Sequence, residues 1–417
     1  MKIGIQTYGS RGDINPWVAL GQGLAREGHD VIVFYTNYTG GDFDHYSEQG
    51  LDVRSSRSLD PHTKAYDAIQ DKPIYALDVL ELTNYMVKEV FDQFSVEIDA
   101  AAEALCKDCE LVISNPSLYQ TSNIAEKRGV PRINVLVECQ FSPTNRVSRF
   151  NDDDINGYFL EPINAHRAKL GLSPVSNART ESFSSTWLNL LAYSRVFATD
   201  EASWGSKYQL CGYFNLDNKG SHSIDSDLHH FLDAGDAPVF ISMGSLAYFE
   251  GQNYEILDIF LEAIELSGCR AIIQADWKSY SRSIPSQLSN VYSLGYLPHE
   301  LILPHCLGVI HHGGAGTSHA ALMNACPSIV VAYAWDQFYW GRELMRLGTS
   351  PAMIKRKFLE PLQLAGAIKS LMLDEEYKER AQEAKRGMKR EKGSKKAASV
   401  IVQAYRELEH DEAEAPA

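Results

Sequence analysis

The chain has 417 residues, of which 44% are hydrophobic and 22% are charged, and its formal net charge is −15 at pH 7. This length fits two domains better than one, and the ordinary composition predicts a folded globular protein. The acidic balance argues against a nucleic-acid partner, because binding a phosphate backbone needs a basic face.

Membrane-spanning and secreted proteins are also disfavoured. No apolar run approaches the roughly 18 residues that a membrane span needs, and the opening MKIGIQTYGSRG lacks the apolar core of a targeting segment. The seven cysteines are scattered, which indicates a reduced, cytoplasmic protein. Cys106 and Cys109 form a lone CxxC, which could be a redox pair or half of a zinc site. Without a second CxxC or CxxH, chance spacing is favoured.

The first half of the chain alternates apolar and amphipathic segments. We predict strands over residues 2–7, 29–35, 110–114 and 132–137, and helices over 16–27 and 119–128. Continuous apolar strands that alternate with helices predict a parallel sheet covered on both faces. Asn15 followed by Pro16 has the pattern of an N-cap and first helical residue, so we expect the first helix to begin there.

Residues 215–236 are rich in Asp, Ser, His, Gly and Asn, and we interpret them as a linker. The alternation then restarts, with strands predicted over 238–243, 270–275, 307–311 and 328–333, and helices over 254–266, from 316, and over 396–408. The fold class is therefore α/β, with two doubly wound Rossmann-like domains whose ligands lie at the carboxyl ends of the strands.

The predicted boundaries follow from this alternation. The first domain covers residues 1–214, the second covers 237–395, a C-terminal helix covers 396–409 and a frayed tail covers 410–417. Residues 385–396 carry seven Lys or Arg. We interpret these residues as a solvated helix face. The alternative is weak attraction to an anionic membrane surface.

The strongest motif is His311-His312-Gly313-Gly314-Ala315-Gly316-Thr317, which follows an apolar strand and opens a helix. Its glycines let backbone N–H groups approach an anion closely, and a helix N-terminus favours negative charge. His312 and Thr317 can donate to phosphate oxygens. The motif lacks a Walker lysine, so it predicts a diphosphate cradle and not NTP hydrolysis. The alternative is a glycine-rich turn with packed histidines.

Two further sites follow strands of the second half. Asp336 and Gln337 place a carboxylate beside an amide, which suits vicinal sugar hydroxyls, although Asp336 could instead cap the next helix. Met243-Gly244-Ser245 ends the first strand of this half, and Ser245 could contact the same diphosphate.

The first half offers GSRGDINP, residues 9–16, directly after its first strand. This is not the GxGxxG dinucleotide fingerprint. We expect Asp13 to lie just before the helix, where its carboxylate could act as general base on an acceptor hydroxyl. A capping or turn role for Asp13 is the alternative.

These motifs resemble those of the family-one glycosyltransferases. The resemblance rests on GSRGDINP, on PHELILPHCLGVIHHGGAGT (298–317) and on DQFYWGRELMRLG (336–348), and it covers nearly the whole chain in order. It is closest to the branch of sterol glucosyltransferases and of bacterial enzymes that glycosylate antibiotic aglycones. It implies the GT-B architecture, with two Rossmann-like domains facing a central cleft and a C-terminal helix that crosses back to the first domain.

The resemblance also implies a reaction. The enzyme would transfer a sugar from a nucleotide sugar to a hydroxyl of a lipophilic compound, with inversion at the anomeric carbon and with no metal or other cofactor. Asp13 falls at the family's catalytic base, and Tyr296 at a nucleobase-stacking position followed by Leu297. The implied diphosphate ligands are Ser10, Ser245, His312, Gly313, Gly314, Ala315, Gly316 and Thr317, and the implied sugar ligands are Trp335, Asp336 and Gln337.

The donor, the acceptor and the reaction class leave alternatives. UDP-glucose is favoured over a deoxysugar donor because Asp336 and Gln337 can satisfy several hydroxyls, although Trp335 stands where relatives often have Gly. Residues 73–94 and 141–159 are rich in aromatic side chains and could line a pocket for a sterol, terpenoid, polyketide or flavonoid, or could be helix core. A nucleotide-sugar epimerase and a non-catalytic helper protein are the rival functions.

Overall fold

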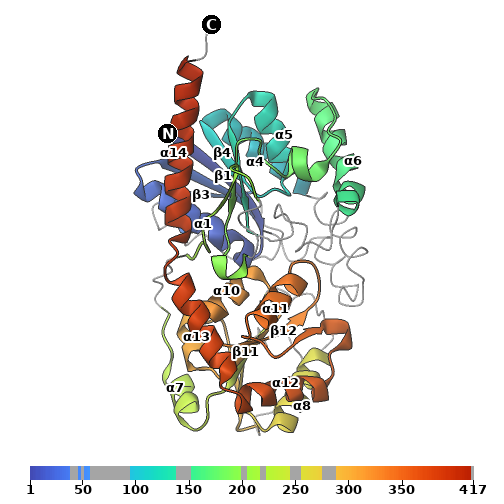
Figure 1. The fold of residues 1–417 in the computed structure, drawn as a ribbon, viewed down its shortest axis with the longest axis vertical. Helices are drawn as coiled ribbons and strands as arrows, with labels where there is room; N and C mark the ends of the chain where they lie inside the picture. Colours follow the sequence, from blue (N-terminus) through green and yellow to red (C-terminus); the bar gives the residue numbers. More distant parts are fainter. Residues whose placement is uncertain are drawn as a thin grey trace. The chain divides into compact units, whose positions relative to one another are not determined.

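The computed structural model describes residues 1–37, 46–47, 51–56, 94–137, 152–198, 204–216, 222–244, 255–274 and 288–414 (Figure 1). These residues form two compact units. Unit 1 holds the described residues up to Leu216 together with those from Glu391 onward, and unit 2 holds the described residues 222–390. The chain therefore leaves unit 1 and returns to it.

Unit 1 is built on a parallel sheet. Its described strands are ordered β3-β2-β1-β4-β5-β6-β7, and each neighbouring pair is parallel. They are β1 (Lys2–Gly9), β2 (Asp30–Asn37), β3 (Asp52–Ser56), β4 (Leu111–Ser114), β5 (Arg132–Leu136), β6 (Leu188–Leu191) and β7 (Tyr208–Leu210). The central strands β1 and β4 are almost wholly buried, as expected where helices cover both faces.

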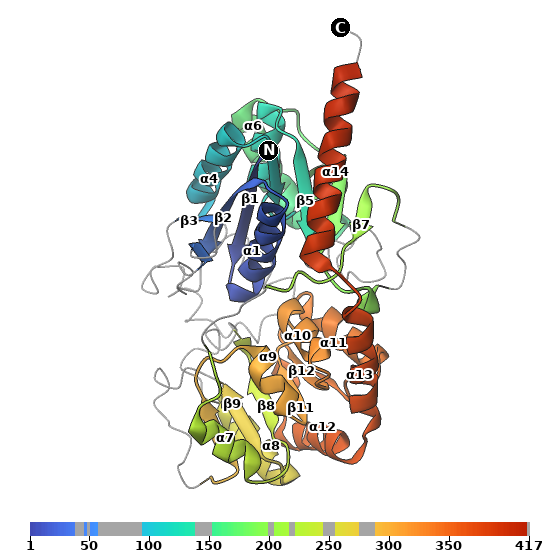
Figure 2. The same cartoon turned by 90° about the vertical axis from the view of Figure 1, so that its left-hand side faces the viewer.

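The described helices of unit 1 cover this sheet. They are α1 (Arg11–Arg26), α4 (Ser95–Asp108), α5 (Tyr119–Arg128), α6 (Asp152–Leu170) and α14 (Gly393–Glu414), with the short helices η6 (Ala178–Ser182) and η7 (Arg195–Phe197). Figures 1 and 2 both show α14 beside α1. Ala397, Ala398 and Ile401 of α14 are fully buried in the same core as Ile3, Ile5 and Trp17.

Two glycines permit the close approach of α14. Gly393 has φ +40, and a Cβ there would collide with the carbonyl oxygen of Tyr213. A Cβ on Gly23 of α1 would lie 3.0 Å from the Ser394 carbonyl oxygen. The start of α14 is also held by Lys396, whose Nζ donates to the Leu210 carbonyl at 2.6 Å, and by Glu391, which accepts from Ser194 Oγ at 2.9 Å.

Unit 2 has a second parallel sheet, ordered β10-β9-β8-β11-β12-β13 among its described strands. The strands are β8 (Val239–Ser242), β9 (Ala271–Gln274), β10 (Val291–Leu294), β11 (Gly308–His311), β12 (Ser328–Ala332) and β13 (Met353–Lys355). The helices are α7 (Ser226–Asp233), α8 (Glu255–Ser267), α9 (His299–Ile302), α10 (Ala315–Met323), α11 (Gln337–Arg346), α12 (Pro361–Leu373) and α13 (Glu376–Met388), with η11 (Leu303–His305) and η12 (Arg356–Phe358).

The predicted α/β class, with two doubly wound parallel sheets, is confirmed. The predicted start of the first helix is wrong: α1 begins at Arg11 with Ser10 as N-cap, so Pro16 lies inside the helix and Asp13 in its first turn. Residues 215–236, interpreted as a linker, include α7, which Asp225 caps by accepting from the Leu228 N–H at 2.8 Å. The final helix runs to Glu414, beyond the predicted start of a frayed tail at 410.

Candidate functional site

Each sheet reverses its strand order at one place. In unit 1, β1 lies beside β4, and in unit 2, β8 lies beside β11, with later strands added outward on both sides. Ligands of doubly wound sheets bind outside the carboxyl ends of the strands at such switch points. The predicted diphosphate motif follows β11, and Gly9 to Asp13 follow β1, so both lie at switch points of their own units.

In unit 2, the turn from β11 into α10 forms the cradle. Gly313 has φ +88, and its N–H donates to Nδ1 of His311 at 3.1 Å, which closes the turn. Gly314 is the N-cap of α10, and no side chain caps this helix. The N–H groups of its first turn, which include Gly316 and Thr317, therefore have no intrahelical acceptor and suit an anion.

The His312 ring is held between two glycines. A Cβ on Gly244, which has φ +58, would lie 2.9 Å from the ring, and a Cβ on Gly314 would collide with Nε2. Within the described residues, the buried Nδ1 of His312 has no hydrogen-bond partner. Burial, followed by the neighbouring His299, lowers the pKa of His312 to about 4. The ring is therefore neutral near pH 7, with an unsatisfied polar atom at the cradle.

Asp336 and Gln337, which were predicted to bind the donor sugar, are fixed by hydrogen bonds that the sequence does not reveal. Gln337 is buried, and its Oε1 accepts the backbone N–H groups of Tyr333 at 2.8 Å and Ala334 at 3.1 Å. The NH2 group of the Gln337 amide is therefore the part of the side chain that can donate a hydrogen bond to a ligand. Asp336 makes no side-chain cap of α11, so the capping interpretation is wrong. Its Oδ2 instead accepts from Nε1 of Trp340 at 2.8 Å.

Trp340 connects Asp336 to the start of α10. Its ring is fully buried and meets the His319 ring edge-on, with 5.2 Å between centroids. His319 Nδ1 donates to the carbonyl of Ala315, the first residue of α10, at 2.6 Å. Sequence analysis missed both residues, although Trp340 lies four positions after Asp336, the spacing at which helical side chains meet.

Three other residues that were predicted to bind the nucleotide sugar lie in different surroundings. Tyr296 is 54% exposed, and its ring meets the His222 ring in a T-shaped contact with 5.7 Å between centroids. The Leu297 side chain is buried in the core of unit 2, and its carbonyl accepts from Gln274 Nε2 at 3.0 Å. Ser245 lies outside the described residues.

In unit 1, Ser10 and Asp13 form a capping box at the start of α1. Asp13 Oδ2 accepts from the Ser10 N–H at 2.7 Å and from Ser10 Oγ at 2.8 Å. Burial raises the pKa of Asp13, and the two bonds from Ser10 oppose that rise. The capping alternative therefore holds for Asp13, and a raised pKa also suits a general base, so the two roles are compatible.

Polar side chains that the sequence analysis did not single out lie at the carboxyl ends of β1 and β4. Tyr8 and Ser117 share a hydrogen bond of 2.8 Å, and Ser117 Oγ donates to Asn115 Oδ1 at 2.6 Å. The hydroxyls of Thr7 and Ser114 are buried without a hydrogen-bond partner in the described part of the chain. Their only sequence signal is that they end apolar strands.

The structure also bears on the CxxC pair, the basic segment and the aromatic regions that the sequence analysis described. Cys106 and Cys109 are free, buried thiols, and burial raises their pKa values to about 12 and about 11, so the chance-spacing interpretation of the CxxC stands. Residues 385–396 include the end of α13, a turn and the start of α14, so they do not form one helix face. Of the aromatic regions, residues 73–93 and 141–151 are outside the described ranges, and Phe159 packs on Phe183.

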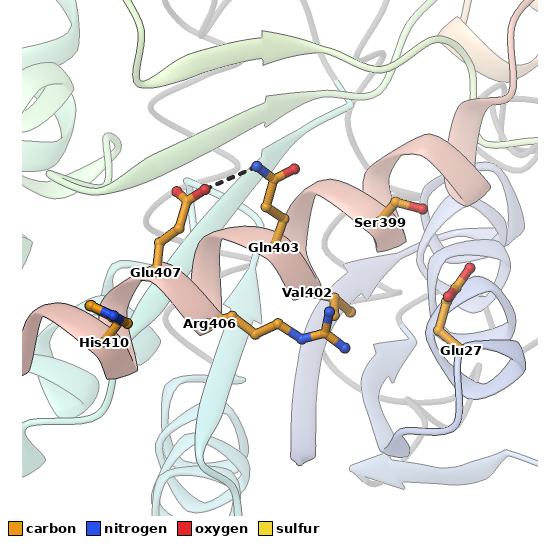
Figure 3. Close-up of a pocket in the computed structure, with 7 residues that line it drawn as sticks. All are labelled: Glu27, Ser399, Val402, Gln403, Arg406, Glu407 and His410. Carbon is orange, nitrogen blue, oxygen red and sulfur yellow. Dashed lines mark hydrogen bonds between the residues drawn. The ribbon is translucent and has the colours of Figure 1, made fainter. Parts of the chain in front are cut away.

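Figure 3 shows a surface pocket of unit 1 beside α14. Its lining consists of Glu27, Ser399, Val402, Gln403, Arg406, Glu407 and His410. Glu27 is the C-cap of α1, so this pocket lies at the other end of α1 from Asp13 and away from the carboxyl ends of the strands. Among the described residues, no cluster of three or more His, Cys, Asp or Glu could hold a metal ion, and no helix is long and apolar enough to cross a membrane.

Comparisons with known proteins agree with this geometry. The family described as erythromycin biosynthesis protein CIII-like, C-terminal domain, matches residues 268–408, which include the cradle. A sterol 3-beta-glucosyltransferase of Arabidopsis thaliana is 27% identical over 94% of this chain and 64% of its own length. The vancomycin aglycone glucosyltransferase of Amycolatopsis orientalis is 27% identical over 84% of this chain and 86% of its own.

Solved structures share the fold. SsfS6, a glycosyltransferase of Streptomyces sp. SF2575 solved with thymidine diphosphate, superposes with a TM-score of 0.66 at 17% identity, covering 97% of this chain and 99% of its own. SnogD of Streptomyces nogalater gives a TM-score of 0.65 at 17% identity, covering 97% and 99%. The two units are thus those of a GT-B glycosyltransferase fold.

The chain is 27% identical to both of these sequence relatives. Together with the family match over residues 268–408, this similarity supports the family-one branch that holds sterol glucosyltransferases and antibiotic glycosyltransferases. The chain spans less than two thirds of the length of the first sterol glucosyltransferases that it matches, namely 64% of the Arabidopsis protein and 35% of that of Saccharomyces cerevisiae.

Proposed function

We propose that this protein transfers a sugar from a nucleotide-sugar donor to a hydroxyl of a lipophilic small molecule. The observation that carries the proposal is the cradle of unit 2, where a neutral His312 with an unsatisfied Nδ1 sits between two glycines at an uncapped helix N-terminus. Such a site suits a diphosphate. The relatives that glucosylate sterols and the vancomycin aglycone support a lipophilic acceptor.

The proposed reaction inverts the anomeric carbon and uses Asp13 as base. The acceptor O–H gives its proton to the Asp13 carboxylate while its oxygen forms a bond to the anomeric carbon. The bond from that carbon to the diphosphate oxygen breaks, and its electron pair leaves with the nucleoside diphosphate. His312, Thr317 and the N–H groups of Gly314 to Gly316 would stabilise that charge, with help from Ser10 and Ser245.

Donor identity is a finer part of the proposal. Asp336 offers a carboxylate and Gln337 an amide NH2, which together match two hydroxyls on one edge of a sugar. UDP-glucose supplies such a pair, whereas a deoxysugar can lack one of them. Tyr296 would stack on the nucleobase. We further propose that transfer needs no metal and takes place in the cytoplasm.

The test is incubation of the protein with UDP-glucose and a panel of sterols, terpenoids and polyphenols in the presence of EDTA, followed by mass spectrometry. We expect a hexose adduct whose anomeric configuration is inverted. Free epimerised sugar nucleotide without an adduct would indicate the epimerase instead. Absence of any product, together with no effect of UDP on the melting temperature, would indicate a helper protein.

A further inference from the structure

Trp335 has a backbone conformation that bulky residues rarely adopt. Its φ is +49, and Trp335 and Ala325 are the described non-glycine residues with positive φ. A left-handed φ is a genuine outlier for a residue of this size, and such strain persists only where the surrounding structure enforces it. Glycine would adopt the same conformation without strain.

The loop around Trp335 is closed tightly by Gln337. The Gln337 side chain accepts the N–H groups of Tyr333 and Ala334, and its own N–H donates to the Ala334 carbonyl at 3.2 Å. Trp335 and Asp336 are therefore the central residues of a turn. Their φ values of +49 and −64 have the signs of a type II′ turn, whose first central position normally holds glycine.

The turn also fixes where Trp335 stands. It immediately precedes Asp336, whose carboxylate Trp340 holds, and it lies two residues before Gln337. Trp335 is partly exposed, while its neighbours Ala334 and Gln337 are buried. The bulkiest side chain thus occupies a glycine-type position at the site proposed for the donor sugar.

We infer that Trp335 is a specificity-determining residue that limits the size of the donor sugar. The indole takes up space that a glycine would leave to the sugar, so donors with a substituent larger than a hydroxyl, such as an acetamido group, are excluded by steric conflict. This inference rests on the proposed function. It adds that the donor is a simple hexose or pentose and that Trp335 enforces this choice.

The experiment compares Trp335→Gly with wild type and with Ala325→Gly. Ala325 has φ +52 and follows the C-terminal end of α10, so the control relieves the same backbone strain away from the proposed sugar site. Steady-state kinetics are measured with UDP-glucose and with UDP-N-acetylglucosamine, and UDP affinity is measured by calorimetry.

In Trp335→Gly, kcat/KM for UDP-N-acetylglucosamine relative to UDP-glucose should rise by about tenfold or more, since a single methylene changes discrimination by roughly 10–200-fold. The ratio should not change in Ala325→Gly, and UDP affinity should stay close to wild type in both variants. An unchanged ratio in Trp335→Gly, with an active wild-type enzyme, would overturn the inference alone. A wild type that transfers neither sugar would overturn the proposed function and this inference with it.

Discussion

The carboxylate of Asp13 accepts both the backbone N–H and the side-chain hydroxyl of Ser10 through the same oxygen, Oδ2. One residue pair therefore starts α1 and positions the proposed base. The bonds from Ser10 stabilise the ionised carboxylate, whereas burial, the larger effect, disfavours it and raises the pKa. Burial and the hydrogen bonds from Ser10 thus have opposite effects on the ionisation of Asp13.

This opposition predicts the behaviour of Asp13→Asn. The variant should lose sugar transfer, because it has no base, yet bind UDP as wild type does. A carboxyl group with a raised folded-state pKa lowers stability as pH rises above its ordinary pKa, and the full loss is reached above the folded-state pKa, because ionisation costs more free energy in the folded protein than in the unfolded chain. The melting temperature of the variant should therefore exceed that of wild type at pH 7, and the difference should shrink as pH falls toward 3.8, the ordinary pKa.

Calorimetric melting across pH 3.5–7.5 checks this prediction, with transfer and UDP binding measured on the same samples. A variant that is less stable than wild type at pH 7 would mean that the hydrogen bonds from Ser10 outweigh the cost of burying the charge. A variant that retains transfer would remove Asp13 from the mechanism.

Gly314→Ala tests the cradle. Gly314 has φ −66 and ψ 151, which any residue adopts, and the nearest obstacle to alanine is the His312 ring, with which the new Cβ would collide. We expect the displaced ring to weaken UDP binding by about tenfold or more, equivalent to about 1.4 kcal/mol.

Gly366→Ala is the matched control for this variant. It places the same methyl group in α12 of the same unit, where, apart from the adjacent helix backbone, no atom of the described residues lies within 4 Å. It should bind UDP normally and gain roughly 0.5–1 kcal/mol of stability through helix propensity. Equal UDP affinity in both variants, measured by calorimetry, would show that His312 does not contact the diphosphate.

Trp340→Phe removes the N–H group that holds Asp336 while keeping an aromatic ring in the core. The carboxylate should then lose its fixed orientation, so KM for the donor should rise, while the affinity for UDP, which lacks the transferred sugar, should be unchanged. Trp17→Phe is the control, because Trp17 is also buried but its Nε1 has no hydrogen-bond partner in the described structure. Similar donor kinetics in the two variants would argue against a positioning role for Trp340.

Stability should fall in mild acid because of buried histidines. Burial lowers the pKa of His299, His312 and His319 to about 4 from an ordinary 6.5. A histidine with a lowered folded-state pKa takes up its proton more readily when unfolded, so its contribution to stability is present above pH 6.5 and is lost as pH falls toward 4.

For the fully buried His319, a shift of this size corresponds to roughly 3 kcal/mol when the loss is complete. Chemical denaturation at pH 7.5, 6, 5 and 4.5 measures how the free energy of unfolding depends on pH. This dependence should be weaker in His319→Gln, whereas His305→Gln, at an exposed position, should show the same dependence as wild type. A wild-type protein with no loss of stability over this range would contradict the lowered pKa values.

The sequence predicted those parts of the fold that follow from local pattern. Apolar runs located β1, β4, β8 and β12, and periodicity located α5 to the residue. It did not predict β7, which is three residues long, or α6, in which Gly157 and Pro162 interrupt the pattern. The start of α1 was misplaced because the Asn15–Pro16 pair hid the capping box formed by Ser10 and Asp13.

The candidate site shows a similar division. His312 and Gly314 belong to a continuous motif at a strand–helix junction, so their neighbourhood is set by local chain geometry. His299, His319 and His222 gain importance only through rings that pack against them from other segments. The orientation of Gln337, with its oxygen turned inward, depends on the loop conformation, which residue types alone do not specify.

Unit 2 is, in terms of connectivity, an insertion within unit 1, since α14 completes the core that begins with β1 and α1. A chimera meant to exchange the donor site with that of a relative therefore needs two junctions, one near residue 217 and one near residue 390, and not a single crossover. Cutting only at the first junction would exchange α14 as well, and the close contact that Gly23 and Gly393 permit would then be formed by residues of two different proteins.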